Sequence, residues 1–239
     1  MSIKFTDIEF LPNNGRKMNL ASAKGVFDPN TTTELLINAV KKTISKPQKI
    51  LDLGCGTGVV GLSLWLEGFA KEPIFASDLS GPSISCSQEN FRRYECEADV
   101  RCGALFEPWG DEKFDVIIDD ISGISQDIAS VSPWFGGVPC DTGRDGTNLV
   151  LDILNNSSKY LAKDGYFFFP VLSLSNVDDI LKEAKENFSI VKLIERQEWP
   201  LPKELEEHIP LLQKLSERRS IKLEERFGMV LCYTEVYLA

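Results

Sequence analysis

The chain of 239 residues is long enough for one α/β domain with a complete core, and its apolar share of 43% is typical of a globular protein. A formal charge of −10 repels polyphosphates on average, so the expected partner is a small-molecule or protein acceptor, with nucleic acid less favoured. No apolar run approaches a membrane span or a signal peptide, so we expect no membrane association and a cytoplasmic location, with the oligomeric state left open.

Strands and helices alternate along the chain. A short alternating apolar piece and a polar turn occupy residues 1–30, which we expect to form an N-terminal extension on the substrate side of a domain over 31–239. Thr31 and Glu34 predict a capping box for the first helix, from about 32 to 44. Further helices are expected at 58–67, 82–94 (capped by Ser80), 148–161, 177–187 and 203–222, and strands at 49–53, 73–77, 98–102, 114–118, 165–172, 189–195 and 229–238.

This alternation predicts an α/β fold with a doubly wound, mostly parallel, seven-stranded sheet, Rossmann-like, whose last strand is antiparallel. Residues 198–226 are expected to form a helical insertion that covers the site, makes a dimer face or is a plain outer helix. The six cysteines are scattered and His208 is the only histidine, so we expect reduced thiols and no metal site.

The stretch 50–61 has the pattern of a buried strand, a glycine turn and the start of a helix. Glycines at alternate positions let the backbone turn sharply and approach a ligand, and they are Gly54, Gly56 and Gly58. Such a unit places free backbone N–H groups and a helix N-terminus at the carboxyl edge of a sheet. The G-x-G-x-x-G that begins at Gly56 also fits a dinucleotide. Asp52, just before the loop, favours a cationic or amino ligand over a pyrophosphate.

Two further groups follow the next strands. Asp78 ends the second strand, about twenty residues after the loop, where an acid can accept both ribose hydroxyls of a nucleoside-containing cofactor. Ala104 and Leu105 follow the third strand and suit the flat face of an adenine ring, whereas Phe106 is nearly as well explained as a core residue.

The fourth strand delivers Asp119 and Asp120 to the same edge, next to the first strand of a doubly wound sheet. A carboxylate there can orient a substrate amine or hydroxyl, or act as a general base. We therefore predict Asp120 as the catalytic residue, whereas for Asp119 a functional role and a plain acidic turn are equally expected.

The pattern Asp52-x-Gly54-x-Gly56-x-Gly58 resembles the first motif of class I S-adenosylmethionine (SAM)-dependent methyltransferases. Over residues 26–171 the chain resembles, more narrowly, the HemK-type methyltransferases, which include protein-glutamine methyltransferases. The matching motifs are Val26-Phe27-x-Pro29-x-x-x-Thr33-Glu34-Leu35-Leu36, Gly103-x-Leu105-Phe106, Phe114-Asp115-x-Ile117 and Gly143-Arg144-Asp145-Gly146. The resemblance implies that SAM is the cofactor, and the residues expected to bind it are Asp52, Gly54, Cys55, Gly56, Gly58, Asp78, Leu79, Ala104, Leu105 and Asp119.

The departure from that group concerns the acceptor. The HemK-type Asn-Pro-Pro-Tyr is replaced here by Asp120-Ile121-Ser122-Gly123, so glutamine or base methylation does not carry over. An amine or hydroxyl of a small molecule is the expected acceptor, with a protein (glutamine-type) or RNA methyltransferase as the alternative. An NAD-dependent oxidoreductase and a non-catalytic SAM-binding module also stay open.

The residues expected to bind substrate are Phe27, Ser122, Trp134 and Arg144. Trp134 precedes Phe135-Gly136-Gly137 in the long loop 120–146, where aromatics beside flexible glycines suit either a lid or a buried anchor. Arg144 is expected either to clamp a carboxylate or to lie on the surface before a helix.

Overall fold

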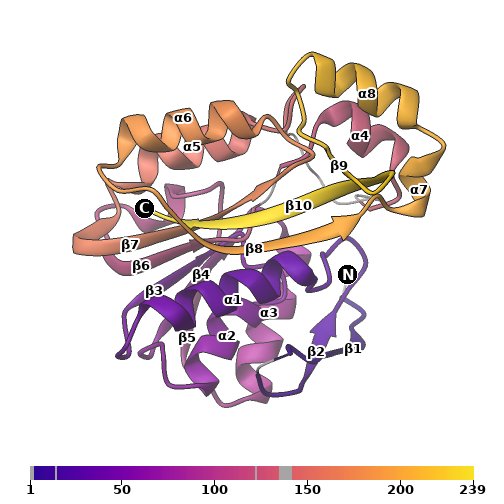
Figure 1. Cartoon of the computed structure of the whole chain (residues 1–239). Coiled ribbons are helices and arrows are strands. Elements are labelled where there is room, and N and C mark those ends of the chain that lie inside the picture. Colours follow the sequence, from indigo (N-terminus) through magenta and orange to yellow (C-terminus); the bar gives the residue numbers. More distant parts are fainter. Residues whose placement is uncertain (1–2, 14, 122, 135–141) are drawn as a thin grey trace. The chain divides into compact units, whose positions relative to one another are not determined.

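The computed structural model describes residues 3–13, 15–121, 123–134 and 142–239. The chain divides into two compact units, and Figure 1 gives the order of their elements along the sequence. Unit 1 comprises Met1–Asp120 with Lys159–Phe169, and unit 2 comprises Ile121–Ser158 with Pro170–Ala239. The first unit therefore contains the glycine loop and the three strands expected after it.

Unit 1 is built on a parallel sheet. Its strand order is β5 (Ala98–Cys102), β4 (Ile74–Asp78), β3 (Ile50–Leu53), β6 (Phe114–Asp119) and β7 (Leu161–Leu172), of which residues 161–169 belong to this unit. All four pairings are parallel. The strand order reverses between β3 and β6, which makes the sheet doubly wound as predicted and opens the ligand-binding crevice of such folds at their carboxyl ends.

Helices α1 (Thr31–Thr43), α2 (Val59–Leu66) and α3 (Gly81–Arg93) pack against one another in a layer beside strands β3, β4 and β5 (Figure 1). A hairpin of β1 (Thr6–Phe10) and β2 (Met18–Ser22) packs on α3, with β2 absent from the sequence prediction. Every residue of β3 is buried, because its apolar side chains face helices and neighbouring strands at once.

The cap of α1 differs from the predicted one. Asn30, not Thr31, is the N-cap residue, and its side chain accepts the Thr32 N–H at 2.7 Å. The reciprocal bond comes from Thr33, whose hydroxyl accepts the Asn30 N–H. Asn30 is the stronger cap former and lies one residue earlier. Glu34, predicted to reach back to the cap, instead accepts the Asn13 N–H at 2.7 Å.

Unit 2 combines helices with an antiparallel group of strands. Its last strand, β10, pairs antiparallel with β8 and β9, as predicted for the end of the chain. The elements are α4 (Gln126–Val131), α5 (Asn148–Ser157), α6 (Val177–Asn187), β8 (Lys192–Pro200), α7 (Lys203–Glu206), α8 (Ile209–Glu217), β9 (Glu224–Arg226) and β10 (Met229–Leu238). In the described parts of the chain, no helix has the length and apolar character needed to cross a membrane.

Three expectations for this region are wrong in detail. The single helix expected over 203–222 is two short helices, because Pro210 has no N–H and is tolerated only at a helix start, here that of α8. The strand expected at 189–195 lies at Lys192–Pro200, where it pairs with β10. The helix expected to reach 161 ends at Ser157, because Leu161 already pairs with Phe114 as the first residue of β7.

The apolar stripe of this segment belongs to the core of unit 2. Leu205, Leu212 and Leu215 are buried in a cluster that also contains Ile124, Ile128, Leu174 and Cys232, and Ile209 packs on its margin. Burial of this stripe explains why α7 and α8 form despite their short lengths, since such helices are stabilised by packing rather than by propensity.

We expect Leu205→Ala to lower the free energy of unfolding by about 2–5 kcal/mol, because it removes a fully buried side chain from this cluster. Ile190→Ala is the matched control, since Ile190 is 66% exposed and its truncation should change stability by only about 0.5 kcal/mol. Urea unfolding measures both. Equal effects of the two substitutions would contradict a core role for α7.

Candidate functional site

The glycine loop between β3 and α2 has the backbone that only glycine adopts readily. Gly54, Gly56 and Gly58 have φ of +72°, +52° and +75°. At Gly58 an added Cβ would lie 3.0 Å from the side chains of Ser87 and Phe91, so packing also requires glycine there. At Gly56 the nearest atom to such a Cβ is the Phe27 carbonyl oxygen at 3.8 Å. The space over Gly56 is therefore the side of the loop that a ligand can approach.

Asp78 is placed at the carboxyl end of β4 as predicted, and it also fastens the loop. One carboxylate oxygen accepts the Gly56 N–H at 3.0 Å and the other accepts the Ser80 N–H at 2.8 Å. Partial burial raises the Asp78 pKa above its ordinary value, and the backbone donors counteract this only in part. Leu79 beside it is 68% exposed, so a large apolar side chain is available at this edge.

Asp52 lies beneath the loop rather than on it. Its side chain is fully buried, and Oδ2 accepts the Gly61 N–H at 2.9 Å. Among the described residues Oδ1 has no hydrogen-bond partner. Burial is the main cause that raises the Asp52 pKa to about 8, and the charges of Asp120 and Asp78 add to it. The predicted contact of Asp52 with a ligand stays a prediction.

Gly61 is a site residue whose purpose the sequence pattern did not reveal. A Cβ at this position would lie 2.7 Å from the Ile74 side chain and 3.4 Å from Asp52 Oδ2. Glycine there lets the first turn of α2 close over Asp52 and donate its N–H to the carboxylate. The N-cap residue Gly58 supplies no side-chain cap to α2, and one of the helix's first N–H groups, that of Gly61, is satisfied by Asp52 instead.

Asp119 and Asp120 end β6 beside β3. Asp119 is fully buried and lies opposite Leu53 in the sheet register, and the Asp120 N–H donates to the Leu53 carbonyl at 3.1 Å. The half-buried Asp120 carboxylate accepts the Thr33 hydroxyl proton at Oδ2, at 3.1 Å. Burial raises the Asp120 pKa to about 7, although the Thr33 bond lowers it. An acid of this pKa is suited to proton transfer near neutral pH.

Of the residues that follow β5, Ala104 and Leu105 lie at the carboxyl edge of the sheet, whereas Phe106 lies in the core. Ala104 and Leu105 are half-buried, and the Gly103 N–H donates to the Asp78 carbonyl at 3.1 Å, which holds this turn beside β4. Leu105 has φ of +45°, an uncommon conformation for a non-glycine residue. Phe106 is buried and stacks on Tyr160 with ring centroids 4.5 Å apart, so its core assignment is the better one.

Asn90 of α3 is a second residue that sequence reasoning missed. Its buried amide accepts the Ala21 N–H at 2.6 Å and donates to the carbonyls of Ala21 at 3.0 Å and Thr57 at 2.8 Å. One side chain thus ties β2 to the glycine loop. Its only sequence signal is an amide on the buried face of a helix that otherwise carries residues such as Ile84, Cys86 and Phe91.

The expected substrate-binding residues are not gathered in one unit. Phe27 is in unit 1 and is 40% exposed, whereas Trp134 and Arg144 are in unit 2, and Ser122 lies outside the described residues, as do Phe135, Gly136 and Gly137. Trp134 packs edge-on against Trp199 at 6.5 Å, which favours the anchor interpretation over a lid. Arg144 is exposed. Their roles toward a substrate stay predictions.

The path of the backbone explains a glycine in the Gly143-Arg144-Asp145-Gly146 segment. A Cβ at Gly123 would collide with the Gly146 carbonyl, so the two glycines allow two loops of unit 2 to cross closely. The Ser125 hydroxyl donates to the Arg144 carbonyl at 3.0 Å, and the Thr147 hydroxyl donates to the Asp145 carboxylate at 2.8 Å.

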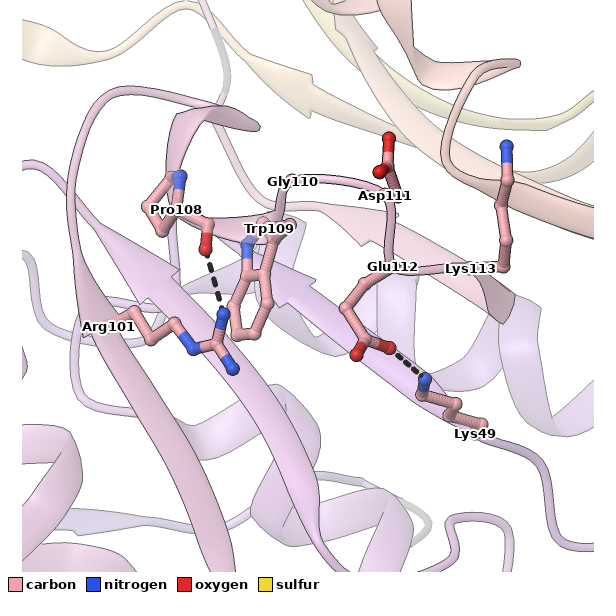
Figure 2. A pocket seen from close by; sticks show the side chains of 8 residues that line it. All are labelled: Lys49, Arg101, Pro108, Trp109, Gly110, Asp111, Glu112 and Lys113. Atoms are coloured by element: carbon pink, nitrogen blue, oxygen red, sulfur yellow. Dashed lines mark hydrogen bonds and ion pairs between the residues drawn. The ribbon is translucent and has the colours of Figure 1, made fainter.

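A cavity of about 560 Å³ lies at the other edge of the unit 1 sheet, where Lys49 and Lys113 precede β3 and β6. Figure 2 shows two interactions in its lining: Lys49 binds Glu112 at 2.6 Å, and Arg101 donates to the Pro108 carbonyl at 2.8 Å. The Arg101 guanidinium also lies over the Trp109 ring at 4.5 Å. This cavity is separate from the carboxyl edge that carries the glycine loop.

Comparison with known proteins finds similarity to methyltransferases. Residues 17–120 match the family model of the methyltransferase small domain. The release factor glutamine methyltransferase of Geobacter sulfurreducens is 24% identical over 149 residues, which cover 59% of this chain and 51% of that protein. The ribosomal protein L11 methyltransferase of Thermosipho africanus is 26% identical over 180 residues, which cover 75% of this chain and 56% of that protein. The chain thus spans about half the length of these relatives.

Among solved structures, the 16S rRNA N2 G1207 methyltransferase of T. thermophilus, in complex with AdoMet and guanosine, matches with a TM-score of 0.66. The match covers 100% of this chain and 51% of that chain at 15% identity, which is a likeness of fold. Together the matches confirm the predicted methyltransferase resemblance and the Rossmann-like fold. The residues that match the methyltransferase small domain model, 17–120, include β2, the glycine loop and all the strand-end acids.

The raised pKa values of Asp52 and Asp120 predict that the free energy of unfolding falls as pH rises. Ionisation of a group whose pKa is higher in the folded state opposes folding, so this stability is present near pH 4 and is lost as pH passes 7 to 8. Chemical unfolding at several pH values measures the slope. Asp52→Asn should flatten it, while the exposed control Asp164→Asn should keep it. An unchanged slope in Asp52→Asn would contradict the assignment.

Proposed function

We propose that this chain is a methyltransferase that binds SAM at the carboxyl edge of β3, β4, β5 and β6 and transfers its methyl group to an amine or hydroxyl. The observation that carries the proposal is the set of carboxyl groups around the glycine loop, Asp52, Asp78 and Asp120, all with raised pKa. No lysine or arginine pairs with any of them in the described ranges. Such a site attracts a cation.

The same charges separate the two cofactors that the glycine pattern allows. SAM carries a sulfonium and an ammonium group, so its binding relieves the repulsion among these acids. A dinucleotide would bring two more negative phosphates to them, which opposes an NAD-dependent oxidoreductase. The unpartnered Asp52 Oδ1 and the open space over Gly56 fit a cationic, closely approaching ligand as well.

In this proposal each part of the edge has a task. The Asp78 carboxylate accepts the ribose hydroxyls, and Leu79, Ala104 and Leu105 provide apolar surface for the adenine. Asp52 and the backbone at Gly54 hold the amino-acid end. When bound, SAM supplies a methyl group on a sulfonium sulfur, which is open to direct displacement. The protein then has mainly to hold the acceptor in line.

Asp120 is the residue for acceptor chemistry. Its pKa of about 7 leaves a substantial ionised fraction at neutral pH, so its carboxylate can accept a proton from the attacking amine or hydroxyl. The asparagine that HemK-type enzymes carry at this position cannot do so. The acid therefore supports a protonatable acceptor rather than an amide.

The charge of −10 supports a small-molecule acceptor, which we propose first. A protein or RNA acceptor is the second candidate, because the relatives are named for a release factor, a ribosomal protein and 16S rRNA. Incubation with SAM labelled in its methyl group and a lysate separated by size distinguishes them. Label in neither fraction would favour a non-catalytic SAM-binding module.

Titration calorimetry with SAM tests the proposed cofactor. We expect binding with uptake of protons by the buffer, and an association constant that rises by about tenfold or more from pH 6 to pH 8, because the cation favours ionised Asp52 and Asp120. NAD should bind far more weakly. Absence of SAM binding by the folded protein would refute the proposal.

Gly56→Ala provides a test of where the ligand lies. The new methyl group enters the open space beside the loop and should weaken SAM binding by about tenfold or more, equal to about 1.4 kcal/mol. Gly68→Ala is the control, because Gly68 also has a left-handed φ, +81°, and open space, but follows α2 away from the loop. Both should lose about 1–2 kcal/mol of stability from backbone strain. Equal SAM affinities in the two variants would place the ligand elsewhere.

A further inference from the structure

Thr33 connects the start of α1 to the acid at the end of β6. Its hydroxyl oxygen accepts the Asn30 N–H at 3.3 Å and, in turn, the hydroxyl donates to Asp120 Oδ2 at 3.1 Å. A threonine hydroxyl has a single proton. The capping bond uses an oxygen lone pair, so the proton is directed to the carboxylate. Thr33 is 3% exposed, which keeps water from replacing it at Asp120.

The surroundings of Asp120 make the Thr33 hydroxyl the group that fixes its carboxylate. The Asp120 backbone is fixed by its N–H bond to Leu53, and Thr33 is the only donor to its carboxylate within the described residues. Acidic residues flank it: Asp119 precedes it in the chain, and Asp52 on the adjacent β3 is close enough for the Asp120 charge to raise its pKa. On α1, the Glu34 carboxylate is engaged by the Asn13 N–H. No described ion pair supplies a cation that would stabilise the Asp120 charge.

We propose that Thr33 is the positioning residue of the acceptor site: its hydroxyl holds Asp120 Oδ2 and favours the ionised carboxylate, leaving Oδ1 to receive the acceptor's proton. The choice of acceptor chemistry rests on the proposed function, whereas the hydrogen bond and its effect on Asp120 do not. Thr33 thereby does two tasks with one oxygen, since it closes the capping box and orients the acid.

The physical basis is the preference of a hydrogen-bond donor for a charged acceptor. Burial disfavours the Asp120 carboxylate and raises its pKa to about 7, and the Thr33 hydroxyl acts in the opposite direction. A hydrogen bond to a charged group is stronger than one to a neutral group, so the donor favours the ionised carboxylate. Without the donor, burial alone would act on Asp120 and favour its neutral form, which cannot accept a proton.

The test measures the protonation of Asp120 in the full chain by NMR of carbonyl-labelled aspartate. The Asp120 signal is identified as the one that is lost in Asp120→Asn. Thr33→Val should reduce the ionised-to-neutral ratio of Asp120 at pH 7 by about tenfold or more. Thr33→Ser, which retains the hydroxyl, should titrate within about twofold of the wild type. Thr33→Ala makes the same test if Thr33→Val does not fold.

Asn30→Ala separates this effect from loss of the helix cap. It removes the bond to the Thr32 N–H and should lower stability by about 1 kcal/mol, but leaves the Thr33 hydroxyl on Asp120. The proposal is overturned if Asn30→Ala shifts the Asp120 titration as much as Thr33→Val does, or if neither shifts it. SAM calorimetry on the same variants distinguishes the two proposals: absent SAM binding with a shifted titration would refute the cofactor and leave the role of Thr33 intact.

Discussion

Parallel pairing of β3 with β4 and β6 is the constraint on which the site depends. It brings the ends of three strands to one edge, and each end delivers an acid: Asp52 within β3, Asp78 as the last residue of β4 and Asp120 directly after β6. None of these acids is adjacent in sequence to another. Their grouping is a property of the sheet, and the charges of Asp120 and Asp78 add to burial in raising the Asp52 pKa.

Neutral side chains hold these charges in place. Asn90 binds both β2 and Thr57 of the glycine loop, and Thr33 binds Asp120, while Gly61 lets a helix N–H reach Asp52. Because backbone and hydroxyl donors do not bring a compensating charge, they orient the carboxylates without neutralising them. The site therefore holds its carboxyl groups in a fixed geometry by neutral donors.

Local pattern was enough to predict the glycine loop, the order of strands and helices from α1 to β6, and the acids at the strand ends, since each depends on residues close in sequence. Local pattern did not predict the features that depend on residues distant in sequence. The burial of Asp52 follows from α2 closing at Gly61, and Asn90 gains its role from partners 33 and 69 positions away. The cap was misplaced by one residue, because Thr31 and Asn30 are both acceptable caps and the stronger cap former, Asn30, is the one used.

The way the chain is threaded through the two units constrains how it folds as it is made. Unit 1 is interrupted after Asp120 and resumes only at Lys159, so its strand β7 is supplied after 38 residues of unit 2 have passed. The ribosome therefore cannot release a finished unit 1 early: until residue 169 has emerged, β6 lacks its outer neighbour and presents an unpaired strand edge. Domains usually fold as units during synthesis. Here the segment that carries the strand-end acids must wait for sequence that is encoded well beyond it.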